Sequence, residues 1–301
     1  MKSPSSITLL SVVIALCGGI AAASGLFWPT GATLTEAFTS VRGEQVTLFG
    51  SGLYRFDALI LGAGFRGQDV ITLVFAAPAL LVATSQSRTN GNIAWVVLRL
   101  VLVTYFAYAY GSLALSASYN PLFLLYVGTF SASLYGLALA TRELHARVSP
   151  SWPVLAQSLP RRGPTLLLLL CGVFTGFIWS EPLIAALIGG TVPPLLGHST
   201  TKVTEVLDLA IIVPAAILAA VLIWQRRIDG YLLGIPLLGL LAMLFLTITA
   251  STISQLQAGV VFTAPEIAGP IGGFLGFGAW GTFLLWRMVT RLRVAEAVTA
   301  S

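Results

Sequence analysis

Residues 230–254, GYLLGIPLLGLLAMLFLTITASTIS, carry no charged side chain over 25 positions, and Arg226 and Arg227 lie just before them. A helix that crosses the hydrocarbon core of a bilayer needs about 20 mostly apolar residues. This segment is long enough, and its arginines lie where a helix would leave the membrane. The segment therefore predicts a transmembrane helix.

The rest of the chain has the same character. Of its 301 residues, 56% are hydrophobic and 9% are charged, and the mean hydropathy is +0.91. Such a composition leaves too little polar surface for a soluble globule of this size. The net charge of +5 comes from basic residues that fall between apolar runs. We therefore expect the lipid bilayer as partner and no nucleic acid.

Eight apolar runs are long enough to cross a bilayer. They are residues 7–28, 67–87, 92–115, 121–141, 163–184, 206–224, 230–254 and 268–290. The connections between them are polar or rich in Gly and Pro, and most are short, the first external loop being longer, so neighbouring helices should be antiparallel. The prediction is an all-α integral membrane protein with a single polytopic membrane domain over residues 1–301.

The loop charges predict the orientation. Cytoplasmic loops carry an excess of Lys and Arg. With eight helices, one side receives Lys2, Arg88, Arg142, Arg147, Arg161, Arg162, Arg226, Arg227, Arg287, Arg291 and Arg293, and the other only Arg42, Arg55 and Lys202. Both termini are predicted to be cytoplasmic, in the cell (cytoplasmic) membrane. A cleaved signal peptide at the first run is the competing reading, but the apolar run continues to Trp28.

Two halves of the chain share a weak pattern, at residues 1–147 and 161–296. Cys-Gly pairs occur at Cys17 and at Cys171, and a Pro precedes an Arg by 21 positions at Pro121 and again at Pro270. This order predicts two parallel four-helix repeats, related by an axis along the membrane normal. Convergent membrane composition is the alternative, and it stays open.

Charged residues in two of the runs suggest a site. Arg66 and Asp69 are three positions apart, as are Lys202 and Glu205, and Glu205 and Asp208. Residues with this spacing share one face of a helix and lie within ion-pair reach. We expect Arg66 and Asp69 to pair and all five groups to converge on one external polar vestibule. A purely structural pair is the alternative.

Four further residues are predicted to line the vestibule: Tyr105, Tyr108, Asn120 and His198. The tyrosines could instead be interface anchors. Arg99, near one end of the run 92–115, is expected to extend to the headgroups. His198 and His145 are expected on opposite sides of the membrane, so no metal site is predicted, and no motif indicates a cofactor.

Four stretches together resemble a group of prokaryotic multi-pass membrane proteins that has no assigned activity. They are GLYRFDALILGAGFRGQDVITL (52–73), YNPLFLLYVGTFSASLYGLAL (119–139), HSTTKVTEVLDLAIIVPAAIL (198–218) and RRIDGYLL (226–233). The resemblance implies no substrate or reaction.

The functional hypothesis is a transporter or permease for a small polar or charged solute. A non-transporting subunit or sensor that docks a partner through its external loops is the alternative. A membrane-embedded enzyme is the third reading, and it would require His198 to bond Asp208 or Glu205. Whether the chain forms a homo-oligomer is left open.

Overall fold

The computed structural model describes residues 5–31 and 37–300, so Lys2 lies outside the described residues. Within this part of the chain, eight helical spans are long and apolar enough to cross a membrane. They are Ser6–Phe27, Leu59–Thr89, Ile93–Ser116, Phe123–Ser158, Arg162–Gly189, Val203–Trp224, Ile228–Gln257 and Ala264–Glu296. The predicted all-α multi-pass fold is confirmed.

Several spans are divided into shorter elements. The α-helices are α1 (Ser6–Phe27), α2 (Leu59–Ile71), α3 (Ala77–Thr89), α4 (Ile93–Ser116), α5 (Phe123–Val148), α6 (Trp152–Ser158), α7 (Arg162–Gly189), α8 (Val203–Leu207), α9 (Val213–Trp224), α10 (Ile228–Gln257), α11 (Ala264–Glu266) and α12 (Gly272–Ala300). Three π-helical segments join consecutive helices, η1 (Thr72–Ala76), η3 (Asp208–Ile212) and η4 (Ile267–Ile271), and η2 (Ser149–Ser151) is a short 3₁₀ turn.

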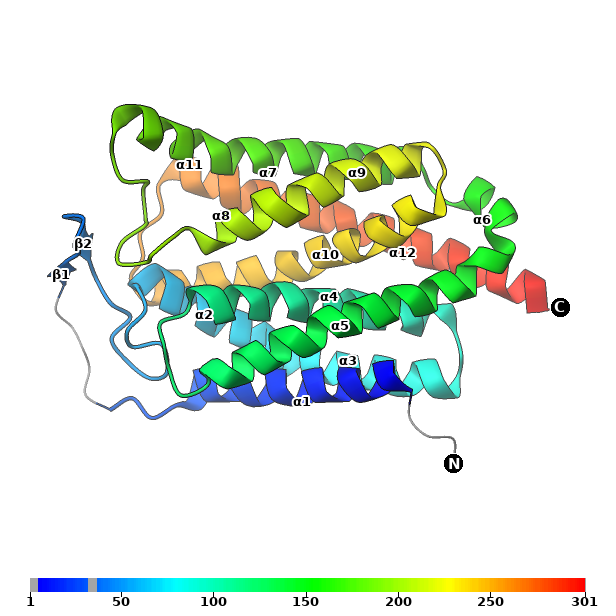
Figure 1. The fold of residues 1–301 in the computed structure, drawn as a ribbon, viewed down its shortest axis with the longest axis horizontal. Coiled ribbons are helices and arrows are strands. Elements are labelled where there is room, and N and C mark those ends of the chain that lie inside the picture. The colour runs from blue at the N-terminus through cyan, green and yellow to red at the C-terminus, as the bar shows by residue number, and fades with distance from the viewer. Residues whose placement is uncertain (1–4, 32–36, 301) are drawn as a thin grey trace.

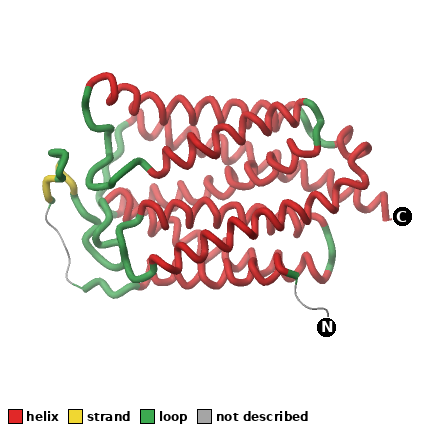
Figure 2. Tube along the Cα trace, viewed as in Figure 1, coloured by secondary structure: helices red, strands yellow, loops and turns green. Residues whose placement is uncertain are grey.

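The helices form an elongated bundle with the connections gathered at its two ends (Figure 2). One end, called here the hairpin end, carries the antiparallel strands β1 (Phe38–Thr39) and β2 (Gln45–Val46). At the opposite end, called the basic end, α1 begins and α12 ends (Figure 1).

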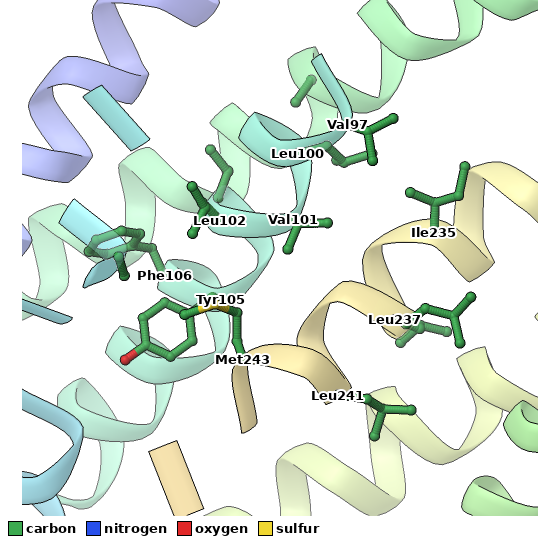
Figure 3. Packing of buried hydrophobic residues seen from close by; sticks show 14 of the residues in the cluster. Val97, Leu100, Val101, Leu102, Tyr105, Phe106, Ile235, Leu237, Leu241 and Met243 are labelled. Carbon is green, nitrogen blue, oxygen red and sulfur yellow. The ribbon is translucent and has the colours of Figure 1, made fainter. Parts of the chain in front are cut away.

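The core of the bundle is the pair α4 and α10, which pack on each other and on most other spans. Figure 3 shows Val101 and Tyr105 of α4 facing Leu237 and Met243 of α10. Gly239 lets the two backbones approach, because an added Cβ there would lie 2.8 Å from the Val101 Cβ. Small residues at such contacts allow close helix packing in membranes.

Matched contacts surround this pair. Helix α4 packs on α3 and α5, and α10 packs on α9 and α12. Two four-helix repeats would produce this arrangement, with the third helix of each at the centre. The arrangement is compatible with the predicted repeat, which stays a prediction.

Helix α2 begins at Leu59, earlier than the start near residue 67 expected from the sequence. Its glycine-rich first turns are held against α10, where Gln255 Nε2 donates to the Ile60 carbonyl at 2.9 Å and Ser251 Oγ to the Gly64 carbonyl at 2.8 Å. Arg66 and Asp69 therefore lie well inside a helix and not at its outer end.

Gly67→Ala should destabilise the fold. A Cβ at position 67 would overlap the backbone of Ala250 and Ser251, which cannot move aside as a flexible side chain can. Overpacking of this kind costs about 1–3 kcal/mol. Thermal unfolding in detergent measures the loss. Gly128→Ala on α5 is the matched control, since a Cβ there meets nothing within 4 Å, and the same loss in both variants would contradict the proposed contact.

Candidate functional site

Asp208 is a buried carboxylate held by two neutral donors. It starts the π-helical segment η3, and its residue is 6% exposed. The Tyr108 hydroxyl of α4 donates to Oδ1 at 2.9 Å, and Trp179 Nε1 of α7 donates to Oδ2 at 2.8 Å. Two donors from different helices stabilise an anion without neutralising it. Asp208 also lines a cavity of ≈ 20 Å³ whose other walls are mostly leucines, about the space of one water molecule.

The local backbone explains why the carboxylate is presented this way. Proline has no N–H, and its ring clashes with the carbonyl four residues earlier. Pro214 follows η3, and Pro78 follows η1, each six positions after the start of its π-helical segment. π-Helical turns are frequent at functional sites. Both second helices of the predicted repeats are therefore weakened at the same place.

Asp208 and Thr72 hold equivalent places, since each is the first residue of its π-helical segment. Each residue contacts a tyrosine of α4: Thr72 Oγ1 shares a 2.7 Å hydrogen bond with the Tyr105 hydroxyl, one turn along the helix from Tyr108. Tyr105 is thus a buried group and lies between helices.

The Asp69 side chain is buried, and it does not form the expected ion pair with Arg66. Asp69 is 1% exposed and accepts a 2.8 Å hydrogen bond from the Tyr54 hydroxyl. A Cβ on Gly25 of α1 would overlap its carboxylate. The Arg66 side chain is exposed, with its guanidinium 6.0 Å from the centre of the Phe49 ring. The three-residue spacing puts Arg66 and Asp69 on one side of α2, but the Asp69 carboxylate is hydrogen-bonded to the Tyr54 hydroxyl instead.

Lys202 and Glu205 form the ion pair that their spacing predicts, at 2.9 Å. Lys202 Nζ also donates to the Pro194 carbonyl at 2.9 Å. The pair lines an open groove of ≈ 550 Å³ at the hairpin end, between the end of α7 and α8. Glu205 lies one helical turn above Asp208, so the charged groove and the buried carboxylate are neighbours.

The charged groups do not share one space. Arg66 lines a second groove, of ≈ 430 Å³, with residues of α1, α2 and α10. This groove, the Lys202 groove and the Asp208 cavity have no lining residue in common. The structure therefore does not bring the five charged residues into the single vestibule expected from the sequence, and whether they bind a solute stays a prediction.

Asn120 and His198 lie in connecting segments. Asn120 is buried and accepts from the Leu122 N–H at 3.0 Å, so it caps the turn before α5. The His198 ring lies 5.8 Å from the ring of Phe38 on β1. Among the described residues, neither Asp208 nor Glu205 is hydrogen-bonded to His198, which is what the enzyme reading required. No group of three His, Cys, Asp or Glu side chains in residues 5–31 and 37–300 could hold a metal ion.

Sequence reasoning missed three partners. Trp179 of α7, which bonds Asp208, and Tyr54 in the loop before α2, which bonds Asp69, were not among the residues predicted to line the vestibule. Arg99 does not extend to the headgroups: it is 1% exposed and forms an ion pair with Glu143 of α5. The sequence signal for that pair was an arginine and a glutamate near the basic ends of consecutive antiparallel spans.

Protein-family models, curated proteins and solved structures give no match to this chain. The resemblance to prokaryotic multi-pass proteins stays a prediction, and function is argued from the geometry.

A third buried aspartate, Asp57, anchors the loop at the hairpin end. Asp57 accepts from the Ser118 N–H at 2.7 Å, joining the segment before α2 to the segment before α5. Its Oδ2 atom is buried and has no hydrogen-bond partner among the described residues. Burial raises the pKa of Asp57 from 3.8 to about 6, although the bonds from Ser118 lower it.

Stability should therefore fall as the pH rises through this range. Between about pH 4 and pH 6 the folded protein holds a proton at Asp57 that the unfolded chain has released, so deprotonation costs about 1–3 kcal/mol. Asp57→Asn keeps an acceptor for Ser118 and removes the charge. We expect this variant to match wild type at pH 4 and to exceed its melting temperature at pH 7. Identical pH profiles would contradict the assignment, and Asp229→Asn, at an exposed pair, is the control.

Glu143→Gln should destabilise the bundle, because it leaves the buried guanidinium of Arg99 without a counter-charge. Removing one partner of a buried ion pair costs about 3 kcal/mol or more. Combining it with Arg99→Met should restore part of the stability. Thermal unfolding in detergent measures both variants, and additive losses would show that the two side chains act independently.

Proposed function

We propose that this chain carries a small polar or charged solute across the cytoplasmic membrane. The observation that supports it is Asp208, a carboxylate inside a span, held by Tyr108 and Trp179 at the start of η3. Ionisable groups within membrane spans are costly and usually belong to substrate or ion pathways.

A purely structural role explains this arrangement less well. Asp208 has no cation among its hydrogen-bond partners in the described chain, and the cavity beside it is lined mainly by apolar side chains. An apolar residue would pack there without the cost of removing a charge from water. An ionisable side chain at position 208 is therefore best explained by a function that needs its charge.

The proposed movement occurs at the two weakened spans. The segments η1 and η3 interrupt the second span and the sixth span, and η4 interrupts the eighth near its start, while α4 and α10 are continuous. Discontinuous helices form the substrate and ion sites of many transporters. In this conformation Asp69 and Asp208 are both buried, so a solute would reach them only after α2 or α8 shifts.

The hairpin end is proposed to face outside, with both termini in the cytoplasm, as the loop charges predict. The open grooves at that end differ in charge: one carries Arg66 and no acid, one carries the Lys202–Glu205 pair, and a third, of ≈ 370 Å³, carries Glu44 and Glu266. The Arg66 groove favours solutes that bear a negative charge, and small anions and amino acids are the first to test.

The test is uptake of labelled small anions and amino acids by vesicles containing the purified protein. We expect at least one to be taken up, with Asp208→Asn reducing the rate about tenfold or more. Asp229→Asn should transport at the wild-type rate, because Asp229 is 56% exposed and pairs with Arg227 at the basic end. Absence of uptake for every solute, or full activity of Asp208→Asn, would contradict the proposal.

Docking of a partner at the hairpin end is the second candidate. Val41 is 99% exposed and Val261 is 89% exposed, and both lie in loops outside the spans. Exposed apolar side chains mark an interaction surface where they form a contiguous patch. The vesicle assay separates the candidates, since a docking protein moves no solute.

A further inference from the structure

We propose that Asp208 is a proton-binding site that is loaded from the hairpin end through Glu205. This inference rests on the proposed transport function and names the ion that would drive it. The observations are the position of Asp208 between an open groove and a closed cavity, and the identity of its partners.

The partners leave Asp208 free to change its protonation. Tyr108 and Trp179 donate to separate carboxylate oxygens, and neither carries a positive charge that would hold the carboxylate ionised. A carboxylate paired with Arg or Lys would keep its charge across the physiological range. Because the two donors come from α4 and α7, any change at Asp208 acts on two helices at once.

The groups around Asp208 on each packed element are few. Helix α8 contributes Glu205, which is paired with Lys202, and α7 contributes Cys171, which lines the same cavity. Helix α4 contributes Tyr108, while α9 and α10 present only aliphatic side chains to the cavity. Within the described chain, Glu205 is thus the acid between Asp208 and the open groove.

The route follows from the helix geometry. Residues three apart lie on one face, so Glu205 of α8 and Asp208 at the start of η3 lie on the same face, one turn apart. Glu205 lines the groove of ≈ 550 Å³, and Asp208 lines the cavity of ≈ 20 Å³. A proton arriving from the groove would bind Glu205 and pass to Asp208, leaving Glu205 ionised again beside Lys202. Chains of Asp, Glu and His form proton relays in membrane pumps and transporters.

Trp179 provides a readout that needs no substrate. Its indole N–H bonds to the carboxylate, so protonation of Asp208 should change the indole fluorescence. The chain has seven tryptophans, and the difference between wild type and Trp179→Phe isolates the signal of Trp179. The protein would be titrated in lipid nanodiscs between about pH 4 and pH 9.

The expected result is a single-proton titration of the Trp179 signal, lost in Asp208→Asn and retained in Asp229→Asn. Tyr108→Phe removes one donor to the anion and should move the midpoint up by about 0.5–1 pH unit. This variant keeps the test decisive if Asp208→Asn fails to fold. A Trp179 signal that does not change with pH, or that titrates equally in Asp208→Asn, would overturn the proposal.

The route has its own test in sealed vesicles that contain the protein in one orientation. After a pH step on the hairpin side, the Trp179 signal should respond faster than the pH of the vesicle interior. Glu205→Gln combined with Lys202→Gln, which removes the ion pair as a unit, should slow this response several-fold. A response that follows only the interior pH would overturn loading from this side.

The two proposals fail separately. A titrating Asp208 without solute uptake would support the proton site and overturn transport. Solute uptake that does not depend on a pH gradient, together with Trp179 fluorescence that does not change with pH, would support transport and overturn the proton site.

Discussion

The close contact between α4 and α10 is the interaction on which the other features depend. Inside a bilayer, helices gain little from hiding apolar surface, so association depends on close packing and on hydrogen bonds between helices. Gly239 supplies the close approach, where its α-carbon faces Val101. With this pair at the centre, α4 presents Tyr105 and Tyr108 to two different weakened spans. The central position of α4 therefore determines where Thr72 and Asp208 find their buried hydrogen-bond partners.

Much of the fold could be predicted from composition alone. Long apolar runs must be helical in a bilayer, because every backbone N–H and C=O needs a partner inside the segment. The start of α2 was missed because the glycines before Arg66 weaken the apolar pattern while they allow contact with α10. Asp57 and Ser118 illustrate a further limit, since nothing local indicates that these two loop residues bond.

The candidate site was less predictable, for a physical reason. Spacing along a helix reveals neighbours on the same helix, and it correctly predicted Lys202 with Glu205. It cannot reveal partners on other helices, such as Tyr54 for Asp69 or Trp179 for Asp208. In both cases the aspartate is bonded to neutral donors from elsewhere in the chain. This choice of partners keeps the carboxylates in place and leaves their charge uncompensated, which a structural ion pair would not do.

The most direct test of this account is a disulfide between positions 101 and 239. Val101→Cys and Gly239→Cys would be combined, Cys17→Ser and Cys171→Ser would remove the native thiols, and a protease site would be inserted between α7 and α8. After oxidation and cleavage, the two halves should migrate together without reductant. The two Cβ atoms would lie 2.8 Å apart, so a shift of about 1 Å between the helices brings them to the separation of about 3.5–4.5 Å found in disulfides. Gly128→Cys with Gly239→Cys is the control pair. Separation of the halves in the first pair would contradict the central placement of α4 and α10.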